Sequence, residues 1–150
     1  MENKTDAIVA STSKQALYLW AGLSLSLTLF FVQSQLVFVK ANPLPSSQLE
    51  WVLSVLGFLT FLMGYFFFDK YTGLRKKQIL KMPFEDRKQS VLIAFVFQFI
   101  LFETLGLYGV LVSVLTQNTW KAIPYVVSAY LGFIIAFPKK QKITPFFRQG

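Results

Sequence analysis

Few side chains in this sequence could do chemistry, and one of them stands apart. Glu103 is the only charged residue in the apolar run from 90 to 115. A carboxylate inside a membrane is a candidate for relaying a proton, holding an ion or making a buried hydrogen bond. The chain has no His and no Cys. Their absence excludes disulfides, thiolate metal sites, cysteine nucleophiles, histidine bases and haem held by His.

Hydroxyl side chains are expected near the depth of Glu103. Spans one and three would run in the same direction, which puts Ser24 and Thr28 near its level. A protonated Glu103 that donates to a hydroxyl or a backbone carbonyl is one interpretation. Ion handling and contact with another subunit are the others. The candidates for an ion-binding or buried polar group are Glu103, Tyr108, Thr28, Thr60 and Tyr130, and Ser128 also falls near mid-span.

Small residues gather on the same helix, just after Glu103. Gly106, Gly109 and Ser113 lie close to one stripe of that helix. Gly109 and Ser113 form a small-xxx-small pair, which lets a neighbouring backbone approach closely. The pattern predicts a helix-packing surface, within the chain or towards a partner. Gln98 lies on another face, where an interhelical hydrogen bond is expected rather than a ligand.

Four apolar blocks must position these residues. The chain is 54% hydrophobic and 15% charged, whereas an average soluble domain is about 25% charged. Blocks of this length without a polar face predict membrane spans rather than a soluble bundle. The first block is too long for the apolar core of a cleaved signal peptide. We therefore predict an all-α fold, a polytopic four-transmembrane-helix bundle in a single domain over 1–150, with spans at about 16–39, 49–68, 90–115 and 122–137.

The basic residues predict the orientation. All of the 15 Lys and Arg residues except Lys40 and Lys121 fall in the tails or in the stretch 69–89, which is read as a basic loop. With four spans, these three segments share one side. The positive-inside rule then makes both termini and the loop cytoplasmic. Nucleic-acid binding is not expected, because the charges flank spans as topology signals do. Residues expected to contact lipid headgroups or a partner are Arg75, Lys76, Lys77, Lys81, Arg87 and Lys88.

Two resemblances add to this reading. Residues 103–115, ETLGLYGVLVSVL, resemble the carboxylate-bearing helix of the rotary ATP synthase proteolipid, the c subunit, and residues 82–88 resemble its polar loop. That resemblance implies that Glu103 carries an ion. The second span has only Gly57 and Gly64 where the proteolipid has alternating glycines. Over its whole length the chain is similar to small uncharacterised bacterial four-span proteins, a likeness that implies the topology and no activity.

These features bear on three classes of function. An enzyme is not expected, because no nucleophile, base and orienting group can be assembled, and no cofactor or metal motif is present. A standalone channel would need an oligomer, because four spans alone form only a thin wall around a transport pathway. We favour an accessory or assembly subunit of a larger complex in the bacterial inner membrane. The alternative is a proteolipid-like protein that handles protons or cations through Glu103. Expected partners are the lipid bilayer and other membrane subunits or further copies of the chain.

Overall fold

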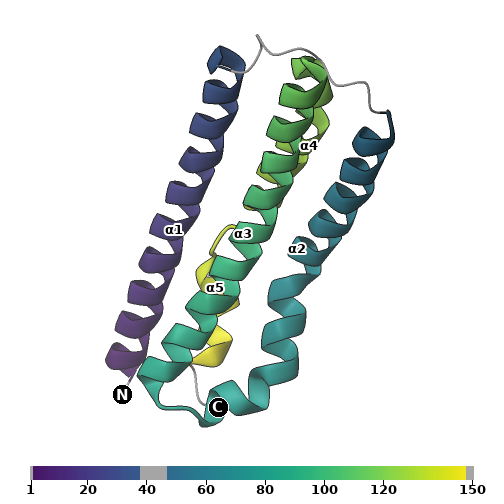
Figure 1. The fold of residues 1–150 in the computed structure, drawn as a ribbon. Coiled ribbons are helices and arrows are strands. Elements are labelled where there is room, and N and C mark those ends of the chain that lie inside the picture. Colours follow the sequence, from purple (N-terminus) through teal and green to yellow (C-terminus); the bar gives the residue numbers. More distant parts are fainter. Residues whose placement is uncertain (1, 38–46, 148–150) are drawn as a thin grey trace.

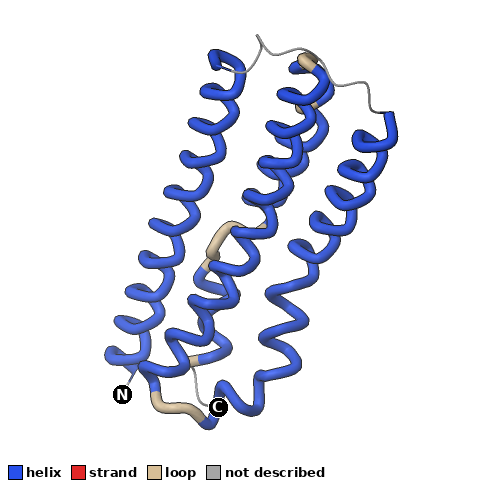
Figure 2. The backbone as a smooth tube through the Cα atoms, viewed as in Figure 1, coloured by secondary structure: helices blue, strands red, loops and turns tan. Residues whose placement is uncertain are grey.

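The computed structural model describes residues 2–37 and 47–147, and all regular elements among them are helices (Figures 1 and 2). The predicted all-α fold is confirmed for this part of the chain. The elements are α1 (Glu2–Val37), α2 (Ser47–Lys81), α3 (Phe84–Thr116), η1 (Thr119–Lys121), α4 (Ile123–Ile135), α5 (Lys140–Ile143) and η2 (Thr144–Phe146).

Three of these helices, α1, α2 and α3, are long and apolar enough to cross a membrane. A fourth crossing is present if the segments Thr119–Ile135 and Lys140–Phe146, which are bent by 67° relative to each other, count as one span. The 13 residues of α4 measure about 20 Å at about 1.5 Å per residue, less than the roughly 30 Å of a hydrocarbon core. The chain is thus a multi-pass membrane protein by helix length and composition.

Helix α3 is the centre of the bundle. It packs against α1, α2 and α4, whereas α1 and α2 hardly touch one another. In Figure 1, α1 and α2 flank α3 and α4 lies behind it. The core is built from phenylalanine rings, such as Phe95 of α3 against Phe68 of α2 with ring centroids 4.4 Å apart. Phe102 of α3 and Phe133 of α4 extend this core, at 6.3 Å.

The predicted basic loop over 69–89 is wrong. Helix α2 continues to Lys81 and α3 begins at Phe84, so only two residues connect them. Thr72 and Ile79 are buried, and they keep the extension of α2 packed on the bundle while its charged residues face outward. Lys, Arg, Gln and Leu are also good helix formers. The expected turn at 40–48 and the end of the first span fall mostly outside the described residues.

The C-terminal segment is packed rather than a free basic tail. After α4 the chain bends, and its apolar side chains Ile143, Phe146 and Phe147 are buried in the bundle. Lys139 and Lys140 between them and α4 stay exposed. This segment lies at the same end of the bundle as the start of α1 (Figure 1).

Candidate functional site

Glu103 lies midway along α3, beside a row of apolar side chains that stay exposed in the described structure. Exposed apolar residues recur along α3 at helical spacing, and Glu103 borders them and is itself partly exposed. The row is on the side of α3 opposite Phe102 and Gly109, which face α4. We call Glu103 together with this row the Glu103 face; its apolar members are Ile93, Phe97, Ile100, Leu107 and Leu111.

Within the described part of the chain, the Glu103 carboxylate has no hydrogen bond and no ion pair. The hydroxyls expected around it bond elsewhere. Ser24 Oγ donates to Trp20 O at 2.8 Å, and Thr28 Oγ1 donates to Ser24 O at 2.9 Å. Neither Thr60, Ser128 nor Tyr108 bonds to Glu103. The structure therefore does not gather the predicted polar candidates into one cluster.

Thr28 and Tyr130 do meet, but with each other. Their hydroxyl oxygens are in hydrogen-bond contact between α1 and α4. Because the one proton of Thr28 goes to Ser24 O, Tyr130 is the donor of this bond. Nearby, Trp20 Nε1 donates to Phe133 O at 2.8 Å. That carbonyl lies in the last turn of α4 and has no intrahelical partner, so the indole of Trp20 caps the helix.

The small residues of α3 face inward. A Cβ added at Gly106 would collide with Leu27 of α1. A Cβ at Gly109 would come within 2.8 Å of Tyr125 Cβ and 2.9 Å of Ala122 O. Ser113 on the same stripe is buried. These positions therefore lie at helix contacts within the chain.

Gln98 makes the interhelical hydrogen bond expected of it. Its Nε2 donates to Gly64 O of α2 at 3.0 Å, deep in the bundle. Its Oε1 is buried without a partner among the described residues. The side chain thus fixes α2 against α3 rather than lining an open site.

The prediction that Arg87 contacts lipid headgroups or a partner is wrong. It is only 3% exposed, and its guanidinium donates to Leu80 O at 2.7 Å, Met82 O at 3.0 Å and Phe146 O at 3.0 Å. The first two carbonyls lie at the end of α2, and the third belongs to η2. The ring of Phe84 lies 4.9 Å from the guanidinium carbon. Arg87 therefore caps one helix and holds the C-terminal segment, which removes it from the lipid surface.

The other basic candidates are placed differently. The residues on the extension of α2 are exposed and available to headgroups or a partner: Arg75, Lys76, Lys77 and Lys81. Lys88 is partly buried and donates to Ser11 Oγ at 3.4 Å. Arg87 differs from them because the carbonyls it binds come together only when α2, α3 and η2 are assembled.

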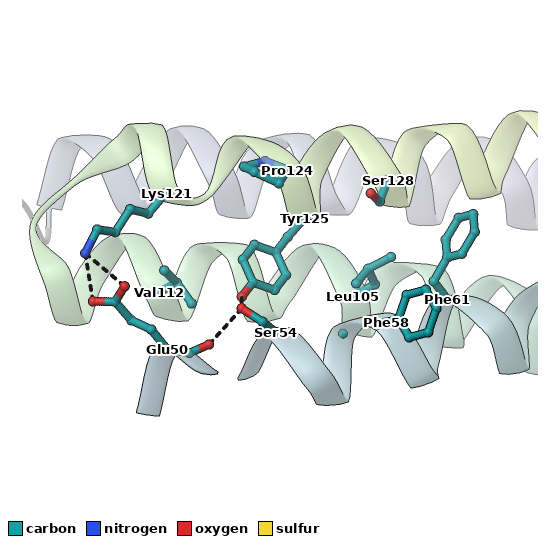
Figure 3. A pocket seen from close by; sticks show the side chains of 11 residues that line it. Glu50, Ser54, Phe58, Phe61, Leu105, Val112, Lys121, Pro124, Tyr125 and Ser128 are labelled. Carbon is teal, nitrogen blue, oxygen red and sulfur yellow. Dashed lines mark hydrogen bonds and ion pairs between the residues drawn. The ribbon is translucent and has the colours of Figure 1, made fainter. Parts of the chain in front are cut away.

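Sequence reasoning missed a groove between α2 and α4, with a volume of about 600 Å³. At one end Lys121 Nζ lies 2.8 Å and 2.9 Å from the carboxylate oxygens of Glu50 (Figure 3). Further in, the hydroxyls of Tyr125 and Ser54 are 2.7 Å apart. The signal in the sequence was a lone acid and a lone base, each at the end of a predicted span.

Comparison with protein-family models, curated proteins and solved structures gives no match. Within the described residues, no group of three or more His, Cys, Asp or Glu side chains is placed to hold a metal ion. Among the described residues, the Glu103 face and the groove between α2 and α4 each combine a charged side chain with exposed apolar surface.

Proposed function

We propose that this protein is an accessory or assembly subunit of a larger complex in the bacterial cytoplasmic membrane, and that it presents the Glu103 face to another subunit. One observation supports this most strongly. Glu103 borders an exposed apolar row in the middle of α3, and its carboxylate has no partner among the described residues.

The energetic cost of that arrangement favours a partner. An ionised carboxylate at the centre of a bilayer costs about 2.5–3.5 kcal/mol on insertion scales. Lipid tails offer no hydrogen bond to offset it, whereas a transmembrane helix with a basic, amide or hydroxyl side chain does. A helix seated on the Glu103 face would also cover Ile100 and Leu107, which are exposed now.

The helices α1 and α2, which flank α3, leave apolar surface exposed that such a partner could contact. The apolar stretch of α1 is only 11% buried within the chain, and Leu25, Leu29 and Phe30 on it are exposed. Because α1 and α2 hardly touch, a helix docked on α3 would meet α1 or α2 as well. In the proposed topology both termini face the cytoplasm, where the exposed Lys and Arg side chains of α2 lie on anionic headgroups.

Purification in mild detergent followed by mass spectrometry tests the proposal. We expect a stoichiometric foreign subunit with the wild-type chain and its loss with Glu103→Leu. Glu85→Gln is the matched control, since it alters an exposed carboxylate at the start of the same helix and should keep the subunit. Recovery of this chain alone from native membranes would overturn the proposal.

A second function has one observation in its favour. The carboxylate of Glu103 is partly exposed and not tied to any described side chain, as a group that takes up and releases a proton or cation would be. Glu103→Gln keeps size and hydrogen bonding but removes the titratable group. If the wild-type chain in reconstituted vesicles conducts protons or sodium and the Gln variant does not, ion handling is favoured. Equal flux in the two eliminates it.

A further inference from the structure

The groove between α2 and α4 is amphipathic along its length, and it lies apart from the Glu103 face. Its polar end holds the Glu50–Lys121 pair, whose side chains are 31% and 43% exposed. Its other end is lined by Phe58, Phe61 and Leu105 (Figure 3). The change from charged to apolar lining follows the direction of the helices.

Two tryptophans place the polar end at the level of the membrane interface. Trp51 follows Glu50 and is 69% exposed, and Trp120 precedes Lys121 and is 79% exposed. Exposed Trp side chains in membrane proteins favour the headgroup region, where one end of the ring is wet and the other apolar. From Glu50 to Phe61 the helix rises roughly 16 Å at about 1.5 Å per residue, about half of a hydrocarbon core of roughly 30 Å. The groove therefore extends through the depth of one leaflet.

We propose that this groove binds a phospholipid of that leaflet, with one acyl chain between α2 and α4 and a phosphoethanolamine headgroup at the Glu50–Lys121 pair. The assignment follows from charge. Lys121 is a donor for the phosphate, and the Glu50 carboxylate accepts from the primary ammonium. An anionic headgroup without an amine leaves Glu50 facing like charge. A choline headgroup has no N–H to donate to Glu50.

The wall of the groove is fixed in position. Tyr125 lies against Gly57, where an added Cβ would be 3.0 Å from the ring. Ser54 Oγ donates to Glu50 O at 2.8 Å, so Tyr125 is the donor in its bond to Ser54. Tyr125 is thereby held across α2 and α4, and the space beside it stays open to the bilayer. A groove held open by internal bonds binds a chain with little cost of reorganisation.

Binding is tested on the purified, delipidated full chain by native mass spectrometry and thermal unfolding. The probes are phosphatidylethanolamine, phosphatidylglycerol and phosphatidylcholine with identical acyl chains. We expect one tightly held phosphatidylethanolamine, bound about five- to tenfold more tightly than the other two lipids. Glu50→Gln should remove that preference, because Glu50 accepts from the ammonium that only phosphatidylethanolamine can donate. Lys121→Gln should weaken the binding of all three lipids, because Lys121 binds the phosphate that they share, and Lys121→Arg should keep both the binding and the preference.

Ser128→Phe fills the groove and should abolish the bound lipid. Val127→Phe is the matched control, because Val127 is exposed on the same helix and does not line the groove. Equal binding of the three lipids, or binding unchanged by Ser128→Phe in a variant that keeps its helicity, would overturn the proposal. A dimer that Ser128→Phe dissociates would also overturn it, because a second copy of the chain would then be the occupant.

Discussion

Tyr130 of α4 donates a hydrogen bond to Thr28 of α1, and this bond joins two helices that otherwise share few contacts. The Trp20 indole makes a second link, to the last turn of α4. Both bonds consume polar groups of α1 and α4 within the chain. Neither of these two bonds involves Glu103 on α3.

The link between α1 and α4 should be measurable as a coupling energy. Thr28→Val and Tyr130→Phe each remove one side of the same bond. The double variant should therefore lower the free energy of unfolding by less than the sum of the two single variants. Hydrogen bonds between transmembrane helices contribute about 0.6 kcal/mol on average. We expect a coupling of that size from a double-mutant cycle of unfolding in detergent. Strictly additive costs would contradict the bond.

Phe102 and Gly132 give a packing prediction. The ring of Phe102 occupies the space that a side chain at Gly132 would need. Gly132→Ala should therefore destabilise the fold by about 1–3 kcal/mol through overpacking, and adding Phe102→Leu should recover part of the loss. Gly73→Ala is the control, because nothing lies near its added Cβ. It should be neutral or stabilising in thermal unfolding, since Ala is a better helix former.

Arg87 should decide whether the C-terminal segment stays docked. Arg87→Met leaves the carbonyls of Leu80, Met82 and Phe146 without their donor, and we expect a loss of about 2–3 kcal/mol. Hydrogen exchange should accelerate over 143–147. Lys88→Met, next to it but less buried, should leave that exchange unchanged. Full protection of 143–147 in Arg87→Met would refute the role of Arg87.

The proposed orientation can be read with single cysteines, because the chain has none of its own. Lys76→Cys lies on the exposed extension of α2, and Asn118→Cys lies in the exposed turn before α4. A membrane-impermeant thiol reagent added to intact cells should label the cysteine at 118 and reach the one at 76 only after lysis. The reverse pattern would invert the topology, and labelling of both in intact cells would rule out the predicted span count.

Some of this structure follows from residue types along the chain, and some does not. Apolar length alone predicted the three long helices, because it depends on no other part of the fold. The helical extension of α2 was missed, since a run of Lys and Arg suits a loop and an exposed helix face equally well. The burial of residues such as Thr72 and Ile79 distinguishes the two.

The side chains next to Glu103 could not be derived from their depth in the membrane. Counting residues along parallel spans gives the level of Thr28 in the membrane, but not the rotation of α1 about its axis. That rotation is set by contacts such as Leu27 against Gly106, which turn Thr28 toward Tyr130. Arg87 presents the same difficulty, because its partner Phe146 is 59 residues away in the chain.

The position of α3 between helices that precede and follow it has a consequence for synthesis. Chains are made from the N-terminus, so α1 and α2 leave the ribosome before the helix that joins them exists. Since these two hardly touch, we expect them to enter the bilayer without packing against each other. We expect the nascent protein to depend on an insertase or membrane chaperone until α3 arrives, and crosslinking of ribosome-bound chains truncated before residue 84 should detect that helper.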